Sequence, residues 1–232
     1  MLGKKVAILQ SNYIPWKGYF DLINSVDEFI LYDDMQFTRR DWRNRNKIKT
    51  KDGVQWVTIP VAVKGKYLQK INETQISEPD WGRRHLETLR ANYLKSPYFH
   101  EYENLLRDLY LSNPSLYLSE VNYRFLKAIC DLLGINTMIS WSSDYELIEG
   151  KTERLVSLCQ QAGGQYYLSG PAAREYIDPL LFAEAGIELA WMDYTGYPEY
   201  PQRFPPFDHA VTILDLLFNV GHNATQYMKS FN

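Results

Sequence analysis

The chain has 232 residues, of which 45% are hydrophobic and 23% are charged, and its formal net charge is -3. This composition is typical of a globular protein, and the length fits one large domain or one domain with an insertion. A negative balance argues against general nucleic-acid binding, because domains of that class usually carry a basic excess. Aromatic residues make up 15% of the chain, with 18 tyrosines, which indicates a broad, partly solvated pocket or an aromatic-rich core.

The cysteines and the N-terminal residues bear on the cellular compartment. Cys130 and Cys159 lie in apolar segments with helical periodicity and have no neighbour at metal-ligand spacing. We therefore expect buried free thiols and a reducing cytoplasm. Residues 1–5 lead directly into a short apolar run, and no long apolar segment follows. This pattern predicts neither a signal peptide nor a membrane span.

The first predicted unit is a strand, a helix and a second strand. Residues 5–9 form a short apolar run, residues 16–25 repeat apolar positions with helical spacing, and residues 29–32 form a second apolar run. Such a unit has a right-handed crossover, so its two strands are parallel. Ligands bind at the carboxyl ends of parallel strands, which is where Gln10 and the pair Asp33-Asp34 stand.

The rest of the chain alternates between the two periodicities. Further strands are predicted at residues 55–63, 71–76, 137–141, 165–168 and 187–192. Helices are predicted at residues 152–162, 179–185 and 211–218, and three more within 81–133, separated at Ser96-Pro97 and Asn113-Pro114. Thr152 is a candidate N-cap, and Gly186 a candidate C-terminal cap. A proline-rich segment at residues 194–207 predicts irregular structure.

Together these elements predict an α/β fold, a Rossmann-like parallel sheet flanked by helices with a helical insertion. We expect an N-terminal β-α-β part with ligand loops at residues 1–80. The helical insertion would span residues 81–135, and residues 136–232 would complete the α/β domain.

A basic segment follows the second strand. Residues 39–51 contain seven basic residues and one acid, Asp41. In an extended conformation the cations at alternate positions would share one face. Such a face could bind phosphate, or it could be a solvated surface. The substrate-binding candidates here are Arg43, Asn44, Arg45, Asn46 and Lys47.

The Asp33-Asp34 pair has two interpretations. These carboxylates could hold a magnesium ion or accept the proton of an amine. They could instead cap the loop and pair with Arg39 or Arg40. Adjacent residues of a strand point to opposite faces, so we expect only one of the two to face a ligand.

The loop after the first strand offers neutral polar and aromatic groups. Gln10 and Asn12 supply donors and acceptors, while Tyr13 and Trp16 could flank a base or a sugar. Gly18 permits close backbone approach. Ser169, in the turn after the strand at 165–168, is a further hydrogen-bonding candidate, since it lacks the flanking glycines of a nucleophile elbow.

Conventional catalytic motifs are scarce. Neither cysteine adjoins a histidine, and the chain has no phosphate-loop or GxGxxG signature. His85 and His222 are the histidines to test as a base, although histidines in such positions are more often surface or capping residues. The catalytic candidates are therefore Asp33, Asp34 and His85, and no metal site is predicted.

Several motifs resemble the WbqC-like family, in the order in which that family has them. They are residues 9–20 (LQSNYIPWKGYF), 33–37 (DDMQF, which adds Gln36 as a binding candidate), 45–48 (RNKI), 167–170 (YLSG), 197–202 (YPEYPQ) and 213–221 (ILDLLFNVG). The resemblance implies a bacterial protein associated with O-antigen and other surface polysaccharides.

A weaker resemblance concerns residues 5–37, which look like the start of a pantothenate-synthetase-type nucleotidylyltransferase. In that fold a His-x-Gly-His motif binds ATP, and an amine then attacks an acyl-adenylate. Trp16 and Tyr19 stand where the two histidines would be.

The leading hypothesis is an enzyme that forms an amide on a nucleotide-linked amino sugar by N-acyl or N-aminoacyl transfer. One alternative is an ATP-dependent carboxylate-amine ligase or nucleotidylyltransferase, in which ATP and magnesium would be cofactors. Another is a non-catalytic scaffold protein of the same pathway. The expected partner is a nucleotide-sugar or another phosphorylated small molecule, and a homodimer is an option.

Overall fold

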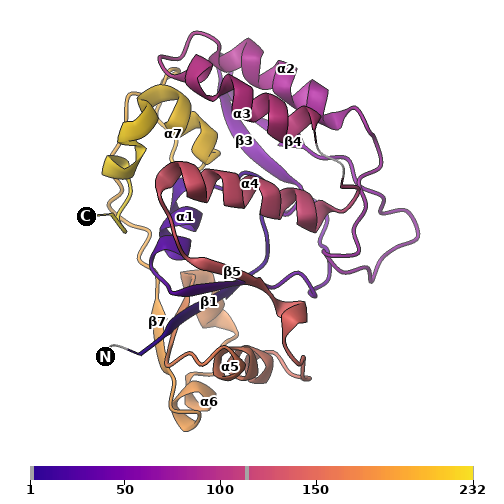
Figure 1. The fold of residues 1–232 in the computed structure, drawn as a ribbon, viewed down its shortest axis with the longest axis vertical. Helices are drawn as coiled ribbons and strands as arrows, with labels where there is room; N and C mark the ends of the chain where they lie inside the picture. The colour runs from indigo at the N-terminus through magenta and orange to yellow at the C-terminus, as the bar shows by residue number, and fades with distance from the viewer. Residues whose placement is uncertain (1–2, 113–114, 232) are drawn as a thin grey trace.

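A computed structural model of the protein describes residues 3–112 and 115–231 (Figure 1). Its central sheet has five parallel strands in the order β5-β2-β1-β6-β7. They are β1 (Lys5–Leu9), β2 (Glu28–Leu31), β5 (Met138–Trp141), β6 (Tyr166–Ser169) and β7 (Glu188–Trp191). The predicted α/β class with a Rossmann-like parallel sheet is therefore confirmed. The order changes direction between β1 and β6, which is where sheets of this type bind ligands.

Helices cover both faces of the sheet because its strands bury side chains on both sides. In β1, Val6 and Ile8 belong to one apolar cluster, which includes Leu158 and Phe182. Ala7 belongs to the other, larger cluster. Alternate strand residues point to opposite faces, so one short strand serves two cores.

The helices that form these cores follow directly from the apolar periodicity. Figure 1 shows α5 (Thr152–Gln161) and α6 (Pro179–Glu184) on one side of the sheet. On the other side lie α1 (Lys17–Asn24), α4 (Leu118–Leu133) and α7 (Ile213–Val220). The 3-10 turns are η1 (Ser142–Asp144), η2 (Pro171–Glu175) and η3 (Gly221–Tyr227).

A hairpin and two further helices extend the larger core away from the sheet. The hairpin pairs β3 (Arg45–Thr50) with β4 (Gly53–Thr58), and α2 (Trp81–Tyr93) packs on α3 (Phe99–Leu111) nearby (Figure 1). Buried residues of α2, α3 and α4 join the cluster that contains those of α1. The helical insertion thus shares its core with the sheet. The segment boundaries at residues 80 and 135 stay predictions.

Two local predictions were wrong. Residues 71–76 do not form a strand, because the backbone turns there: Thr74 N donates to Ile71 O at 3.1 Å. Pairing with other segments is limited to isolated bridges, such as that of Ile76 with Val61. Thr152 is the first residue of α5 and not its cap. Its hydroxyl accepts a hydrogen bond from Asp178 N at 3.1 Å and so ties α5 to the start of α6.

Other local features fall close to the predictions. Gly186 follows the cap residue of α6 and has a φ of 70°, in the left-handed region that favours glycine. Cys130 and Cys159 are buried free thiols, and burial raises the pKa of each to about 12. The expected break at Asn113-Pro114 lies outside the described residues. No helix in the described part of the chain combines the length and apolarity needed to cross a membrane.

Candidate functional site

Two pockets lie on either side of the loop that leaves β1 at the carboxyl edge of the sheet. Gln10 lines one pocket and Asn12 lines the other. The loop after β1 therefore has a polar side chain at each pocket. This location agrees with the strand-end rule that made the loop a candidate from the sequence.

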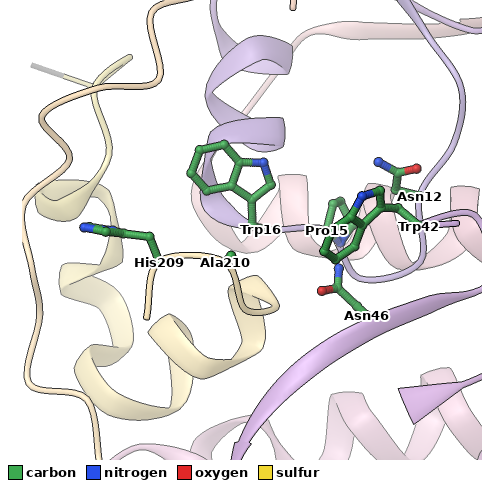
Figure 2. Close-up of a pocket in the computed structure, with 7 residues that line it drawn as sticks. All are labelled: Asn12, Pro15, Trp16, Trp42, Asn46, His209 and Ala210. Carbon is green, nitrogen blue, oxygen red and sulfur yellow. The ribbon is translucent and has the colours of Figure 1, made fainter. Parts of the chain in front are cut away.

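The first pocket, here called the tryptophan pocket, has a volume of about 300 Å³. Its lining residues are Asn12, Pro15, Trp16, Trp42, Asn46, His209 and Ala210. Figure 2 shows Trp16 at the start of α1, with Asn12, Trp42 and Asn46 to one side and His209 to the other. The pocket thus joins the loop after β1, the hairpin and the residues between the proline-rich segment and α7.

Gly18 allows the wall of this pocket to form. A Cβ atom at position 18 would lie 2.3 Å from the indole ring of Trp16, so the ring occupies space that any other residue would fill. On its other sides the ring packs edge-on against Tyr194 and Tyr197, with centroid distances of 5.1 and 5.5 Å. Trp16 is therefore held in one orientation.

Asn46 shapes the loop as well as lining the pocket. Its Nδ2 donates to the carbonyl oxygens of Tyr13, at 3.1 Å, and Ile14, at 2.9 Å. Ile14 has a φ of 36°, a strained value for a β-branched residue. Tyr13 N also donates to Trp42 O at 3.1 Å. The strained loop is thus fastened to the hairpin, as ligand-binding loops often are.

An aromatic and cationic surface adjoins the tryptophan pocket. Trp42 and Trp56 are each 38% exposed, and their ring centroids lie 5.0 Å apart. The Arg45 guanidinium lies 4.0 Å from the Trp56 ring centroid, and Lys47 Nζ lies 5.5 Å from it. We call these four residues the Trp-Arg platform. Trp42 belongs both to the platform and to the pocket.

Only residues 45–50 of the basic segment are extended, as β3, and the cations of the segment do not share one exposed face. Arg45 and Lys47 belong to the platform, whereas Lys49 is buried and its Nζ donates to Pro206 O. Arg43 precedes the strand and bends toward the loop after β1. The proline-rich segment that covers Lys49 could not be placed from the local charge pattern.

The second pocket, here called the tyrosine pocket, has a volume of about 390 Å³. Its lining residues are Ile8, Leu9, Gln10, Tyr32, Met35, Gly150, Lys151, Arg154, Leu155, Tyr167 and Tyr176. They come from β1, the end of β2, the start of α5, β6 and the chain just after η2. This pocket therefore opens at the change of direction between β1 and β6.

Arg43 lies between the two pockets. Its Nη1 donates to Asn12 Oδ1 and, at 3.5 Å, to Gln10 O. Its Nη2 lies 3.6 Å from Asp41 Oδ2, its side chain is 12% exposed, and its buried Nε has no partner among the described residues. One half-satisfied guanidinium thus touches a residue of each pocket, which makes Arg43 the best-placed anion ligand of the basic segment.

Asp33 and Asp34 point to different surroundings, as the alternation of strand residues suggests. Asp33 is buried and accepts from Ser11 N at 2.7 Å and from Ser119 Oγ. Burial raises the pKa of Asp33, against the effect of these hydrogen bonds. Its contacts tie the loop after β1 to α4.

Asp34 accepts from Ser142 Oγ at 2.6 Å and lies 3.6 Å from Lys70 Nζ. Lys70 is thus its cationic partner in place of the expected Arg39 or Arg40. Across the described residues, no three His, Cys, Asp or Glu side chains are grouped so that they could hold a metal ion.

Tyr13 and His85 belong to a buried aromatic cluster with Trp81 and Tyr110. The Tyr13 hydroxyl bonds His85 Nδ1 at 2.9 Å and the Tyr110 hydroxyl at 2.8 Å. His85 Nε2 lies 3.1 Å from Thr58 O, so Nε2 donates and Nδ1 accepts. Burial lowers the pKa of His85 to about 4, so this ring is neutral at pH 7. These side chains line neither pocket.

Three other candidates lie outside the two pockets. Gln36 Nε2 donates to Tyr67 O at 2.6 Å, and Asn44 Nδ2 donates to Ile59 O at 2.8 Å. Ser169 is buried at the end of β6, where it hydrogen-bonds the Tyr167 hydroxyl. The first two contacts connect separate segments of the chain, whereas Ser169 contacts a residue of its own strand.

Sequence reasoning missed much of both pocket walls. Trp42, His209, Arg154 and Tyr176 were not candidates, although each lines a pocket. A partial signal existed for Arg154, because a helix was predicted at residues 152–162 after the strand at 137–141, and a helix that follows a parallel strand starts near the carboxyl edge of the sheet. No local pattern connects His209 with the loop after β1, since about two hundred residues separate them.

Comparison with known proteins gives the family. The sequence pattern of the WbqC-like protein family matches residues 10–227. The chain is also 55% identical over 226 residues to an uncharacterized protein of Mycobacterium tuberculosis, Rv1507c, a match that covers 97% of this chain and 98% of that protein. No solved structure matches the chain. The protein therefore belongs to the WbqC-like protein family.

Proposed function

We propose that the protein binds a nucleotide-linked amino sugar and transfers an acyl or aminoacyl group to the sugar amine, in the assembly of a bacterial surface polysaccharide. The amide bond forms as the acyl carbon of an activated donor loses its leaving group, and the amine loses a proton. The proposal rests on the pathway that the resemblance to the WbqC-like family implies, and on the chemistry of the tryptophan pocket and the Trp-Arg platform. A nucleotide-sugar has a flat base, a diphosphate and a hydroxylated ring, and the site offers matching groups for each.

The observation that carries the proposal is the continuity of the platform with the pocket through Trp42. Exposed indoles provide stacking faces for a base, worth about 1–3 kcal/mol per base. Arg45 and Lys47 stand beside these rings and can pair with a diphosphate. Asn12 also lines the pocket, and its amide nitrogen can bond a sugar hydroxyl, whereas the Asn46 amide is already engaged with the Tyr13 and Ile14 carbonyls and Lys47 N and shapes the wall.

His209 is the best candidate to accept the amine proton. Amide formation requires a neutral amine, so a base near it has a definite task. His209 is the only titratable side chain among the described residues that line the pocket. Burial lowers its pKa and the nearby Lys17 lowers it further, which keeps the imidazole neutral and able to accept a proton at pH 7. Asp33 is committed to buried hydrogen bonds, so we assign it a structural role.

Calorimetric titration with UDP-, GDP- and TDP-linked amino sugars tests the proposal. We expect one of these to bind, and Trp42→Ala to weaken its binding by about tenfold, the equivalent of about 1.4 kcal/mol of lost stacking. Tyr67→Ala is the matched control, because Tyr67 is exposed and lines a different hollow. If none of the three sugars binds, or if both variants bind like the wild type, the proposal is wrong.

A second candidate is an ATP-dependent ligase or nucleotidylyltransferase. It rests on the sequence resemblance of residues 5–37 to the start of a nucleotidylyltransferase, and the start of α1 in that segment lies at the tryptophan pocket. Release of AMP or pyrophosphate in the presence of magnesium would identify this activity. If the protein binds a nucleotide-sugar without turnover, it would instead be a scaffold of the pathway.

A further inference from the structure

The tyrosine pocket has no part in the nucleotide-sugar site described above. It lies on the other side of the loop after β1, with Gln10 in its wall, whereas Asn12 belongs to the tryptophan pocket. Its floor is apolar, formed by residues such as Ile8 and Leu155. Polar groups stand around this floor, the arrangement typical of small-molecule sites.

The cations of this pocket lack counter-ions of their own. Arg154 Nε donates to Ile148 O at 2.5 Å, and Nη1 lies 4.0 Å from Met35 Sδ. Within the described part of the chain, Arg154 and Lys151 form no ion pair with a carboxylate. A half-buried guanidinium is usually paired, because leaving its charge unmatched is costly. Arg154 therefore has donors available for an anion from outside the chain.

The electrostatic surroundings of the pocket include a third cation. Burial raises the pKa of Tyr176, and the charge of Arg43 opposes that rise, so Arg43 acts on this pocket as well. Burial also raises the pKa of Tyr32, and Arg154 opposes that rise. Both phenols are therefore protonated at pH 7 and can donate hydrogen bonds.

Two acidic side chains lie near enough to the tyrosine pocket to offset its positive charge. Asp34 acts on Tyr32, but it is paired with Lys70 at 3.6 Å. Glu153 is exposed, and its carboxylate lies beside the Gly150 backbone. Arg43 is itself paired with Asp41 at 3.6 Å, so Lys151 and Arg154 are the cations that give this pocket its unbalanced positive charge.

We propose that the tyrosine pocket binds the anionic group, a carboxylate or a phosphate, of a second small molecule. Arg154 would hold the anion, with Lys151 at the rim and the Tyr32 and Tyr176 hydroxyls as further donors. If the proposed function holds, this molecule is the activated acyl donor, its anionic group serves as an anchor apart from the acyl carbon that reacts, and Arg43 lies between it and the nucleotide-sugar. The binding itself does not depend on the step that follows.

Thermal unfolding with inorganic phosphate or acetate, at ionic strength matched with sodium chloride, tests this site. A ligand that binds only the native state raises the melting temperature. We expect at least one of the two anions to do so. A response to phosphate alone indicates a phosphorylated ligand, and a response to acetate indicates a carboxylic acid. The inference is overturned if neither anion raises the melting temperature above that in chloride.

Variants assign the response to the pocket. Arg154→Gln should weaken the apparent affinity by about tenfold or more, as loss of a charge-assisted pair does. Lys151→Gln, at an exposed position where folding is not at risk, should weaken it by a smaller factor. Arg107→Gln, an exposed arginine of α3, is the matched control and should respond like the wild type. An unchanged response in both Arg154→Gln and Lys151→Gln would overturn the inference.

The same variants separate this inference from the proposed function. Trp42→Ala should keep the anion response, and Lys151→Gln should keep nucleotide-sugar affinity. If no nucleotide-sugar binds but the anion response is lost in Arg154→Gln, the proposed function fails and the anion site stands. If a nucleotide-sugar binds but the anion response is absent, the anion site fails and the proposed function stands.

Discussion

Replacing His85 by glutamine should reduce the loss of stability that acidification causes. The imidazole is 8% exposed, and burial lowers its pKa from 6.5 in the unfolded chain to about 4. Between these values the unfolded state binds more protons than the native state. The contribution of neutral His85 to the free energy of unfolding is therefore complete above pH 6.5 and is lost as the pH falls toward 4.

The size of this effect follows from the pKa difference. Each pKa unit corresponds to about 1.4 kcal/mol, so lowering the pH from 7 to 5 should cost about 2 kcal/mol through His85 alone. In His85→Gln this part of the pH dependence should vanish, even though the variant is less stable at both pH values. Buried acids such as Asp33 also titrate, but subtracting the variant from the wild type removes their contribution.

Urea unfolding of the wild type and His85→Gln at pH 7 and pH 5 measures this difference. His100→Gln, which removes a histidine from the exposed side of α3, provides the baseline for losing an imidazole. If His85→Gln and the wild type lose the same free energy of unfolding between the two pH values, the assignment of a neutral structural histidine is refuted.

Three further predictions concern single positions. Gly18→Ala should displace the Trp16 ring, because the new Cβ would lie 2.3 Å from it; a tryptophan emission spectrum identical to that of the wild type would contradict this. Asp33→Ala should lower the free energy of unfolding, measured in urea, by about 3 kcal/mol, because the buried donors Ser11 N and Ser119 Oγ lose their acceptor. A loss near zero would mean that water replaces the carboxylate. Phe182→Ala should lower the free energy of unfolding by about 3–5 kcal/mol in the same assay, because Phe182 is fully buried and its ring stacks on that of Tyr167 with a centroid distance of 4.8 Å. A loss below about 1 kcal/mol would indicate that the core collapses around the cavity.

The sheet could be predicted because its signals are local. The strand at residues 5–9 has the predicted bounds, since a short apolar run between polar residues has few other uses. The strand predicted at residues 71–76 was wrong because the chain turns there: Ile71 is buried in the larger core, and Ile76 forms only an isolated bridge. The loop at residues 10–16 was located by a topological rule, the position of ligands at the carboxyl ends of parallel strands, which needs no knowledge of side-chain contacts.

The walls of the two pockets could not be predicted in this way. Trp42 and His209 meet across the tryptophan pocket, although 167 residues separate them in the chain. Arg154 reaches the tyrosine pocket from a helix whose start was predicted but whose orientation was not. Their convergence depends on the packing of whole elements, for which a single sequence has no periodic signal.

The amino-acid sequence by itself determined the fold class, the strand order up to the second strand, the family and the loop that lies between the pockets. Only the tertiary structure decided what the polar side chains do. It joined Asp33 to Ser119, 86 residues away, placed Lys49 under the proline-rich segment, and enclosed Tyr13 with His85. The physical reason is that a strand or a helix is set by neighbours two to four residues away, whereas the partner of a buried polar group is set by distant segments that pack against it.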